Sequence, residues 1–252
     1  MSSVGVTPAG EALSPRQHRA GRLITLEGGE GSGKSTQMKA IQRMLEAIGL
    51  DVVMTREPGG TPASEALRGA LLAGQFRHMG ASAEAVLFAA ARIIHLDEKI
   101  LPALAGGAWV VCDRFIDSTR VYQGTVDGLD PHLLDVLETV ALGTMRPALT
   151  LVLDVDPEVA MHRTALRRGH VQADRFEAGD LERYHRIREG FREIAAKSAD
   201  RCVLIDASGD STAVSRQIEA VIADRLFTRL RQEKWRKIQQ NALGHAAIPN
   251  HL

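Results

Sequence analysis

Residues 28–35 read GGEGSGKS, and this stretch decides the fold because it fits the pattern GxxxxGK[S/T]. The apolar run before it, Leu23–Glu27, predicts a buried strand. The segment after it, Lys34–Ile48, has apolar residues at helical spacing and ends at Gly49. A strand, a glycine-rich turn and a helix in this order are typical of a phosphate-binding loop. A glycine-rich turn without a ligand is the alternative, but this pattern rarely arises by chance in this context.

The residue types in this loop suit a bound chain of phosphates. Glycines permit a tight turn that points successive backbone N–H groups inward, and the helix N-terminus adds partial positive charge. Lys34 would reach the β- and γ-phosphates, and the Ser35 hydroxyl would bind Mg²⁺. By itself the loop predicts only the binding of a nucleoside triphosphate. The residues expected to hold it are Gly28, Gly29, Glu30, Gly31, Ser32, Gly33, Lys34, Ser35 and Thr36.

Outside the loop, short apolar runs alternate with helical segments. Four further runs predict buried strands, at residues 51–55, 109–112, 149–153 and 202–205. Helices are expected from Pro62, over about 82–104, from Pro131, from Pro157 to near Gly169, over about 179–199 and over about 212–230. This alternation is typical of βαβ units. We therefore expect an α/β fold of the P-loop NTPase type, with a five-stranded parallel sheet, helices on both faces and a small lid.

Composition limits the classes of function. A chain of 252 residues with 44% hydrophobic and 25% charged residues suits one larger globular domain. Its formal net charge of zero provides no global field for nucleic acid or an anionic membrane, and no run approaches the ~20 apolar residues that cross a bilayer. Cys112 and Cys202 lie in apolar runs, which predicts buried thiols in a reducing compartment. We expect a cytoplasmic protein.

Charged residues follow two of the predicted strands. Asp113 and Arg114 come directly after residues 109–112, and Arg56 follows residues 51–55. In open α/β sheets ligands bind beyond the carboxyl ends of the strands. Asp113 would hold Mg²⁺ through water, unless it caps a helix or pairs with Arg114. Since the loop accounts for the triphosphate, the two arginines indicate a second anionic ligand, with a surface salt bridge as the alternative.

Five motifs occur together and in this order: LEGGEGSGKST (26–36), TREPGGT (55–61), LFAAAR (87–92), DRFIDSTRVYQG (113–124) and DRFE (174–177). With them the chain resembles bacterial thymidylate kinases over about residues 22–227. The resemblance implies phosphorylation of dTMP to dTDP by ATP and Mg²⁺, through in-line phosphoryl transfer, in dTTP synthesis. It also implies a homodimer, whose partners are ATP and dTMP, with no nucleic acid and no membrane.

The resemblance assigns roles to the matching residues. Glu30 would lie beside the sugar and phosphate of dTMP, and Arg56 and Arg114 would contact the acceptor phosphate. Phe88 would stack on thymine, and Arg92 would bind a base carbonyl. The other residues implied to line the nucleotide site are Ser118, Thr119, Gln123 and Tyr122, the last of which would crowd a ribose 2′-OH.

The residues alone leave other interpretations open. Phe88 would be a core side chain, and Arg92, a charge in an Ala-rich helix, would need a partner. Tyr122 and Gln123 would be surface residues. The rival functions are a kinase for another monophosphate or a deoxynucleoside, and a P-loop switch that hydrolyses its nucleotide slowly.

A basic segment at about residues 163–178 predicts the lid. Transfer to an acceptor other than water needs a closed, dry site and a cation that arrives with closure. Residues 28–35 contain no arginine, so the resemblance implies the bacterial arrangement, in which the lid supplies it. Arg175 and Arg168 (or Arg167) are the candidates, and they would act with Lys34 and Arg114. A solvated basic helix end is the alternative.

The two ends of the chain lie outside the resemblance. Residues 1–20 lack the apolar centre of a signal peptide and predict a disordered leader. Residues 231–252 predict a flexible tail. The nucleoside monophosphate kinase domain is expected over residues 21–230.

Overall fold

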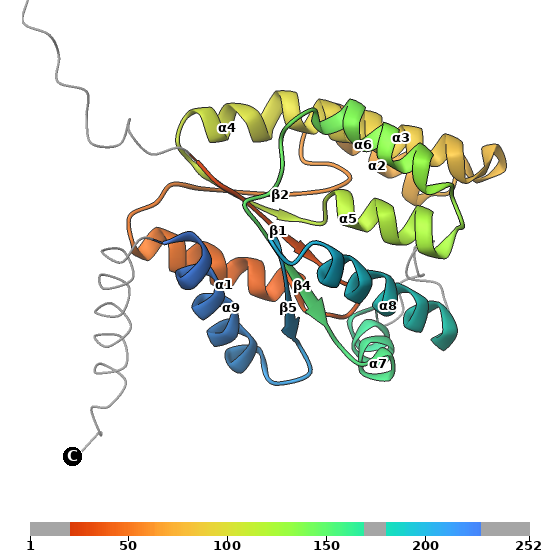
Figure 1. The fold of residues 1–252 in the computed structure, drawn as a ribbon. Coiled ribbons are helices and arrows are strands. Elements are labelled where there is room, and N and C mark those ends of the chain that lie inside the picture. Colours follow the sequence, from red (N-terminus) through yellow and green to blue (C-terminus); the bar gives the residue numbers. More distant parts are fainter. Residues whose placement is uncertain (1–20, 169–179, 228–252) are drawn as a thin grey trace, which may run out of the picture.

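A computed structural model describes residues 21–168 and 180–227, and a sheet of five parallel strands lies at its centre (Figure 1). The strand order is β2-β3-β1-β4-β5, and every neighbouring pair is parallel. The strands are β1 (Leu23–Glu27), β2 (Val52–Arg56), β3 (Trp109–Asp113), β4 (Leu149–Asp154) and β5 (Cys202–Asp206). This sheet confirms the predicted α/β fold.

Every strand ends on a charged residue. These residues are Glu27, Arg56, Asp113, Asp154 and Asp206. Apart from β1, the apolar runs in the sequence stop one residue short of the observed strand ends, because a charged residue interrupts the apolar pattern. Since all five strands run in the same direction, the charged ends lie along one edge of the sheet, where ligands bind in such folds.

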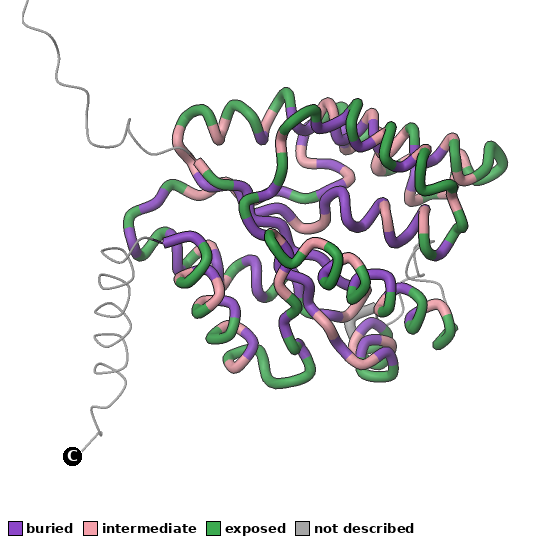
Figure 2. Tube along the Cα trace, in the orientation of Figure 1, coloured by how far each residue is buried: buried purple, intermediate pink, exposed green. Residues whose placement is uncertain are grey.

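Helices cover both faces of the sheet. On one face α1 (Lys34–Ala47) and α9 (Ser211–Leu226) pack side by side, and Ile24 and Leu26 of β1 join their apolar cluster. Leu23, which points the other way, packs into the cluster on the opposite face. Figure 2 shows the buried strands between helices whose outer sides are exposed. The remaining helices are α2 (Pro62–Leu72), α3 (Gly80–His95), α4 (Leu101–Ala105), α5 (Ile116–Thr119), α6 (Pro131–Leu142), α7 (Pro157–Arg168) and α8 (Leu181–Lys197).

The helical segment after β3 is absent from the sequence-based prediction. Helix α5 continues directly into a π-helical turn, Arg120–Val126. Its polar sequence lacks apolar residues at helical spacing, so no periodicity announces it. Tyr122 and Gln123, which the residues alone place on the surface, are buried, and the Tyr122 ring packs edge-on against Phe191 of α8 at 6.4 Å between centroids. Buried polar residues in this segment indicate a site rather than a core.

Contrary to the expectation from the sequence, the helical run Arg77–Ala105 is long and apolar enough, by length and composition alone, to cross a membrane. It consists of a 3₁₀ turn (Arg77–Met79), α3, a π-helical turn (Leu96–Ile100) and α4. The core helix of a globular protein has the same properties. Here α3 packs against α2 and α6, and Leu96 and Ile100 join the apolar cluster on the face of the sheet opposite α1 and α9.

Both cysteines are free and buried, as predicted. The predicted leader and tail, and the lid beyond α7, lie outside the described residues. The domain limits and the lid therefore stay predictions.

Candidate functional site

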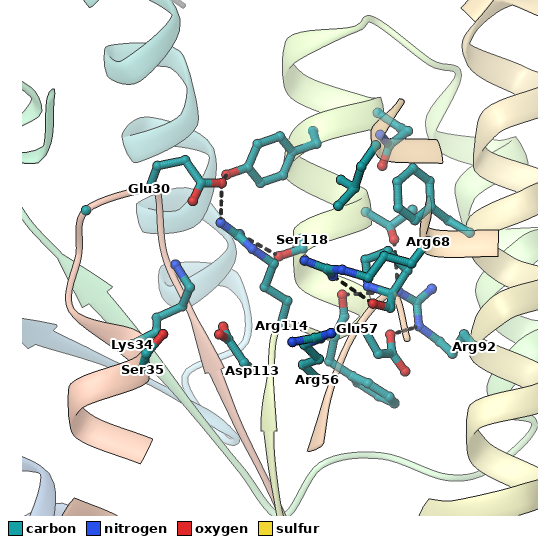
Figure 3. A pocket seen from close by; sticks show the side chains of 18 of the residues that line it. Glu30, Lys34, Ser35, Arg56, Glu57, Arg68, Arg92, Asp113, Arg114 and Ser118 are labelled. Carbon is teal, nitrogen blue, oxygen red and sulfur yellow. Dashed lines mark hydrogen bonds and ion pairs between the residues drawn. The ribbon is translucent and has the colours of Figure 1, made fainter. Parts of the chain in front are cut away.

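A cavity of about 560 Å³ opens at the carboxyl edge of the sheet (Figure 3). It brings together most of the residues that the sequence proposes for a site. Those that line it are Glu30, Gly31, Gly33, Lys34, Ser35, Thr36, Arg56, Phe88, Arg92, Asp113, Arg114, Ser118, Thr119, Tyr122 and Gln123. Three other residues of the loop do not line this cavity, namely Gly28, Gly29 and Ser32.

The glycine-rich loop has the geometry that its sequence predicts. Gly31 has φ 74°, and a Cβ there would lie 2.3 Å from the Ala160 carbonyl oxygen, so a larger residue would strain the backbone and collide with α7. Ser32 Oγ closes the turn by donating to Gly29 O at 2.9 Å. The N-terminus of α1 follows at Lys34. The loop and this helix end form an anion site of the expected kind.

Lys34 folds back over the loop. Its Nζ donates to Gly28 O at 3.0 Å and to Gly29 O at 2.8 Å, and the residue is 7% exposed. Burial, and next the guanidinium of Arg114, lower the pKa of Lys34 to about 8. An anion in the loop would offset both effects, so the lysine is placed for a phosphate.

Asp113 at the end of β3 keeps a carboxylate oxygen for a ligand. Its Oδ1 is buried and has no hydrogen-bond partner within the described part of the chain. Its carboxylate makes no ion pair with Arg114, which pairs with Glu30 instead, so the interpretation of Asp113 as a salt-bridge partner of Arg114 is wrong. Magnesium is typically held by one or two carboxylates together with substrate phosphates. The Asp113 carboxylate and the Ser35 hydroxyl, which line the same cavity, fit that requirement.

Arg114 sits at the centre of the site. Its guanidinium pairs with Glu30 at 2.5 Å, donates to Gly28 O and Ser118 Oγ, and lies 5.1 Å from the centroid of the Tyr122 ring. Burial is the largest single effect and lowers the pKa of Arg114. The Glu30 carboxylate, followed by Tyr122, Asp113 and Glu27, acts in the other direction, and together they keep this pKa above its usual value. Its backbone is left-handed, with φ 64°. This costs roughly 1–2 kcal/mol and indicates a backbone constrained for function.

Beneath Arg114, the buried carboxylate of Glu27 holds the first turn of α5. Glu27 accepts from Phe115 N at 2.8 Å, from Ser118 N at 3.2 Å and from Ser118 Oγ at 2.6 Å. Burial, and next the carboxylate of Asp117, raise the pKa of Glu27 to about 7. The contacts fix Ser118 against Arg114, so β1 supplies support for the site as well as the loop.

Phe88 and Arg92 lie one turn apart on α3 and both line the cavity. Phe88 is only half-buried, so the interpretation of it as a core side chain is wrong. Arg92 has the partner that its burial requires. Its Nε donates to Glu57 Oε2 at 2.7 Å, and its Nη2 donates to Thr119 Oγ1 at 3.0 Å.

Arg56 satisfies both interpretations of its sequence position. It lines the cavity, and it pairs with Glu65 of α2 at 3.1 Å. Both side chains are well exposed, so this pair is weak and leaves the guanidinium available to a stronger anion.

The structure adds residues to the site that the sequence does not single out. Arg68 and Leu72 of α2 line the cavity, and Arg68 donates to Pro58 O at 2.7 Å. Glu57, inside the TREPGGT motif, is buried and pairs with Arg92. The amphipathic pattern of α2 does not indicate which face of the helix contacts a ligand. For Glu57 the sequence does contain a signal, because a glutamate directly follows an apolar strand.

Among the arginines within the predicted lid segment, about residues 163–178, only Arg163 has a described side chain. It lines the cavity and donates to Ala207 O at 3.1 Å. The side chains of Arg167 and Arg168, and the whole of Arg175, lie outside the described residues.

Comparison with known proteins gives one consistent result. A family model described as thymidylate kinase matches residues 26–218. The thymidylate kinase of Bradyrhizobium sp. (strain ORS 278) is 49% identical over 218 residues, which cover 86% of this chain and 96% of that protein. The thymidylate kinase of Nitrobacter winogradskyi (strain ATCC 25391 / DSM 10237 / CIP 104748 / NCIMB 11846 / Nb-255) is 47% identical over 218 residues, covering 86% and 95% of the two chains.

A solved structure agrees with the sequence relatives. The crystal structure of thymidylate kinase from Ehrlichia chaffeensis matches with a TM-score of 0.66 and 33% identity, covering 81% of this chain and 99% of that one. The family match spans the phosphate loop, the Arg56 and Arg114 strand ends and α3, which together form the cavity. The chain therefore belongs to the thymidylate kinase family, the nucleoside monophosphate kinases that use ATP to convert dTMP to dTDP.

Proposed function

We propose that ATP lies on the loop Gly28–Thr36 and that dTMP lies over Phe88, with the acceptor phosphate between Arg56 and Arg114. The observation that carries this assignment is that the cavity lined by the phosphate loop is also lined by several arginines, among them Arg56, Arg92 and Arg114. The loop suits one polyphosphate. The arginines beyond it suit a second ligand that already bears a phosphate, which favours a monophosphate over a nucleoside as acceptor.

In this arrangement the protein acts mainly by positioning. A phosphate oxygen of dTMP attacks the γ-phosphorus of ATP in line, and the bond to the β–γ bridging oxygen breaks, releasing ADP. The attacking oxygen is already anionic, so no dedicated base is required. Lys34 and Arg114 lie on either side of the point where the acceptor phosphate meets the γ-phosphate. They stabilise the charge on the transferring group.

Mg²⁺ completes the proposal. Ser35 and Asp113 would hold it, and the ion would neutralise charge on the phosphates when bound. Arg175 or Arg168 would bring a further cation as the lid over about residues 163–178 closes. The net charge of zero and the two buried thiols support a cytoplasmic enzyme with no nucleic-acid or membrane partner.

Removal of the Phe88 ring tests the acceptor site. Stacking of a base on an aromatic ring is worth roughly 1–3 kcal/mol, so Phe88→Ala should raise KM for dTMP about fivefold to a hundredfold and leave KM for ATP unchanged. A coupled assay of ADP release measures both constants. The same assay with dUMP, UMP, dGMP and AMP as acceptors separates this function from its rivals.

A matched control for this variant is Phe76→Ala, which removes a ring that does not line the cavity. It should behave as the unmodified enzyme. An unchanged KM for dTMP in Phe88→Ala would place the base elsewhere. Steady nucleotide hydrolysis that is indifferent to dTMP would indicate a switch instead of a kinase.

We also propose that the protein is a homodimer joined through α3 and α6. These neighbouring helices carry three exposed valines, Val86 at 48%, Val136 at 44% and Val140 at 66% exposure. Exposed apolar groups on adjacent helices mark an interaction surface. Both helices lie in the layer above the sheet in Figure 1.

A charge on this face should break the dimer. Val140→Asp would bury an unpaired carboxylate at the interface, so the mass measured by light scattering should fall from two chains to one. Val159→Asp, at a 37% exposed valine of α7, is the control and should stay dimeric. A single-chain mass for the unmodified protein at micromolar concentration would refute the proposal.

A further inference from the structure

His95 ends α3 and is completely buried, at 0% exposure, yet both of its ring nitrogens are bonded. Nδ1 lies 3.1 Å from Glu57 Oε1, and Nε2 lies 2.6 Å from Thr55 Oγ1. The ring does not line the cavity. It therefore touches no substrate, but the residues that it contacts belong to the segment on which the cavity depends.

Through Glu57 the ring reaches Arg92. The second oxygen of Glu57 accepts from Arg92 Nε at 2.7 Å, and both side chains are 4% exposed. Arg92 Nη2 is fixed separately by Phe115 O and Thr119 Oγ1. Among the described residues no acceptor holds Nη1, and Figure 3 shows this guanidinium beside Glu57 at the cavity wall. Two of the three nitrogens are thus locked, which fixes the direction of the third.

The partners of the ring order its two bonds. A carboxylate can only accept, so Nδ1 donates to Glu57 Oε1. Nε2 bonds with the Thr55 hydroxyl, which can either donate or accept. The chain of bonds runs from Thr55 to His95 to Glu57, where it meets the bond from Arg92. A histidine in this place joins a donor to an acceptor, which no aliphatic residue of its size can do.

The same ring also positions the end of β2, where Arg56 lies. Thr55 precedes that arginine, and Gly60 packs so close that a Cβ there would lie 2.5 Å from His95 Nε2. Gly60 N in turn donates to Glu65 Oε1 at 2.9 Å, and Glu65 is the ion-pair partner of Arg56. One buried side chain therefore contacts the supports of both Arg92 and Arg56.

We propose that His95 is a positioning residue for the monophosphate site, which holds Arg92 through Glu57 and the Arg56 end of β2 through Thr55 and Gly60. This inference rests on the proposed function, in which Arg92 contacts the base and Arg56 the acceptor phosphate. The ring sets the distance between these two arginines. The site therefore favours a ligand whose base and phosphate are separated by a matching distance.

Two amide substitutions separate the two bonds of the ring. In His95→Asn the side-chain N–H₂ falls near the position of Nδ1 and can still donate to Glu57. In His95→Gln the amide reaches the position of Nε2 and can still accept from Thr55, but the donor to Glu57 is lost. A hydrogen bond to a charged group that is lost in this way should raise KM for dTMP roughly tenfold. We expect that rise in His95→Gln, with KM for ATP unchanged, and a rise below about threefold in His95→Asn.

His78→Gln, at an exposed histidine in the 3₁₀ turn before α3, is the control and should leave all constants unchanged. Equal rises in both His95 variants, or a matching change in KM for ATP, would mean a general packing role and overturn the proposal. Should His95→Gln not fold, Glu57→Gln, which keeps the ring in place, must show the selective rise, and its absence would be equally decisive.

Arg92→Ala separates this inference from the function on which it rests. If Arg92→Ala raises KM for dTMP but His95→Gln does not, His95 does not position Arg92, and the acceptor site stands. If Arg92→Ala leaves KM for dTMP unchanged, both the assignment of Arg92 and the role of His95 are refuted.

Discussion

Lys34→Ala is expected to lower kcat by about 10²–10³-fold, the loss that follows removal of one preorganised donor from a site of developing charge. The side chain is held against the loop by two carbonyl oxygens, so it is in place before the γ-phosphoryl group moves. The backbone amides of the loop survive the substitution and should still bind ATP. KM for ATP should therefore change less than kcat.

The measurement is ADP release at saturating dTMP, with Lys39→Ala as the matched control because Lys39 is an exposed lysine on the same helix. The control should keep full activity. If kcat of Lys34→Ala were more than a tenth of kcat of the unmodified enzyme, the lysine would bind nucleotide without stabilising the transferring group.

The ionisation of Lys34 adds a pH dependence to the same prediction. Burial, and next Arg114, bring its pKa to about 8, so the amine is charged below this pH and neutral above it. A neutral amine cannot attract phosphate. The value of kcat/KM for ATP, which reports the free enzyme, should fall above about pH 8, by about tenfold for each further pH unit. A flat profile from pH 7 to 10 would mean that the lysine stays charged throughout.

The sequence was sufficient for the parts of this molecule that depend on short-range pattern. Apolar runs located the strands, and GGEGSGKS located the loop, because each is a property of consecutive residues. The charge of Arg92 in an Ala-rich helix predicted that this side chain has a partner, and the structure confirms it. The identity of that partner, Glu57, was not predictable from spacing, since the two residues meet only when β2 and α3 are packed together.

Helix α5 and its π-helical turn show a different limit. Residues 116–126 are mostly polar, and their helical form is supported by contacts from elsewhere. The buried carboxylate of Glu27 holds the first turn, and Arg201 makes a bidentate pair with Asp117 at 2.7 Å. Apolar periodicity cannot reveal a helix whose stability comes from buried polar bonds.

The left-handed backbone of Arg114 likewise could not be read from its sequence. Few non-glycine residues adopt this conformation, and nothing in the DRF motif announces it. The conformation turns the side chain back toward Glu30 and Gly28, away from the direction of β3. The left-handed conformation depends on contacts within the folded site, so only the structure reveals it.

Replacement of Arg114 provides the second large effect. Arg114→Ala removes the proposed contact with the acceptor phosphate and removes the ion pair with Glu30 inside the cavity. Loss of one member of a buried, hydrogen-bonded charge pair costs roughly 2–5 kcal/mol, which corresponds to a fall of about 30-fold to 4,000-fold in kcat/KM for dTMP. Arg114→Lys should recover little of this, because an ammonium group cannot bond to Glu30, Gly28 O and a phosphate in one plane.

Arg114→Gly gives a matched comparison that separates catalysis from backbone strain. Alanine and glycine both lack the guanidinium, so the two variants should lose the same activity. Glycine, however, adopts φ 64° without strain. The free energy of unfolding of Arg114→Gly should therefore exceed that of Arg114→Ala by about 1 kcal/mol, and Arg114→Gly should unfold at a higher temperature. Steady-state kinetics and thermal unfolding of the pair test both statements. Equal stabilities would show that the backbone at residue 114 carries no strain, and activity within tenfold of the unmodified enzyme in either variant would remove Arg114 from the acceptor site.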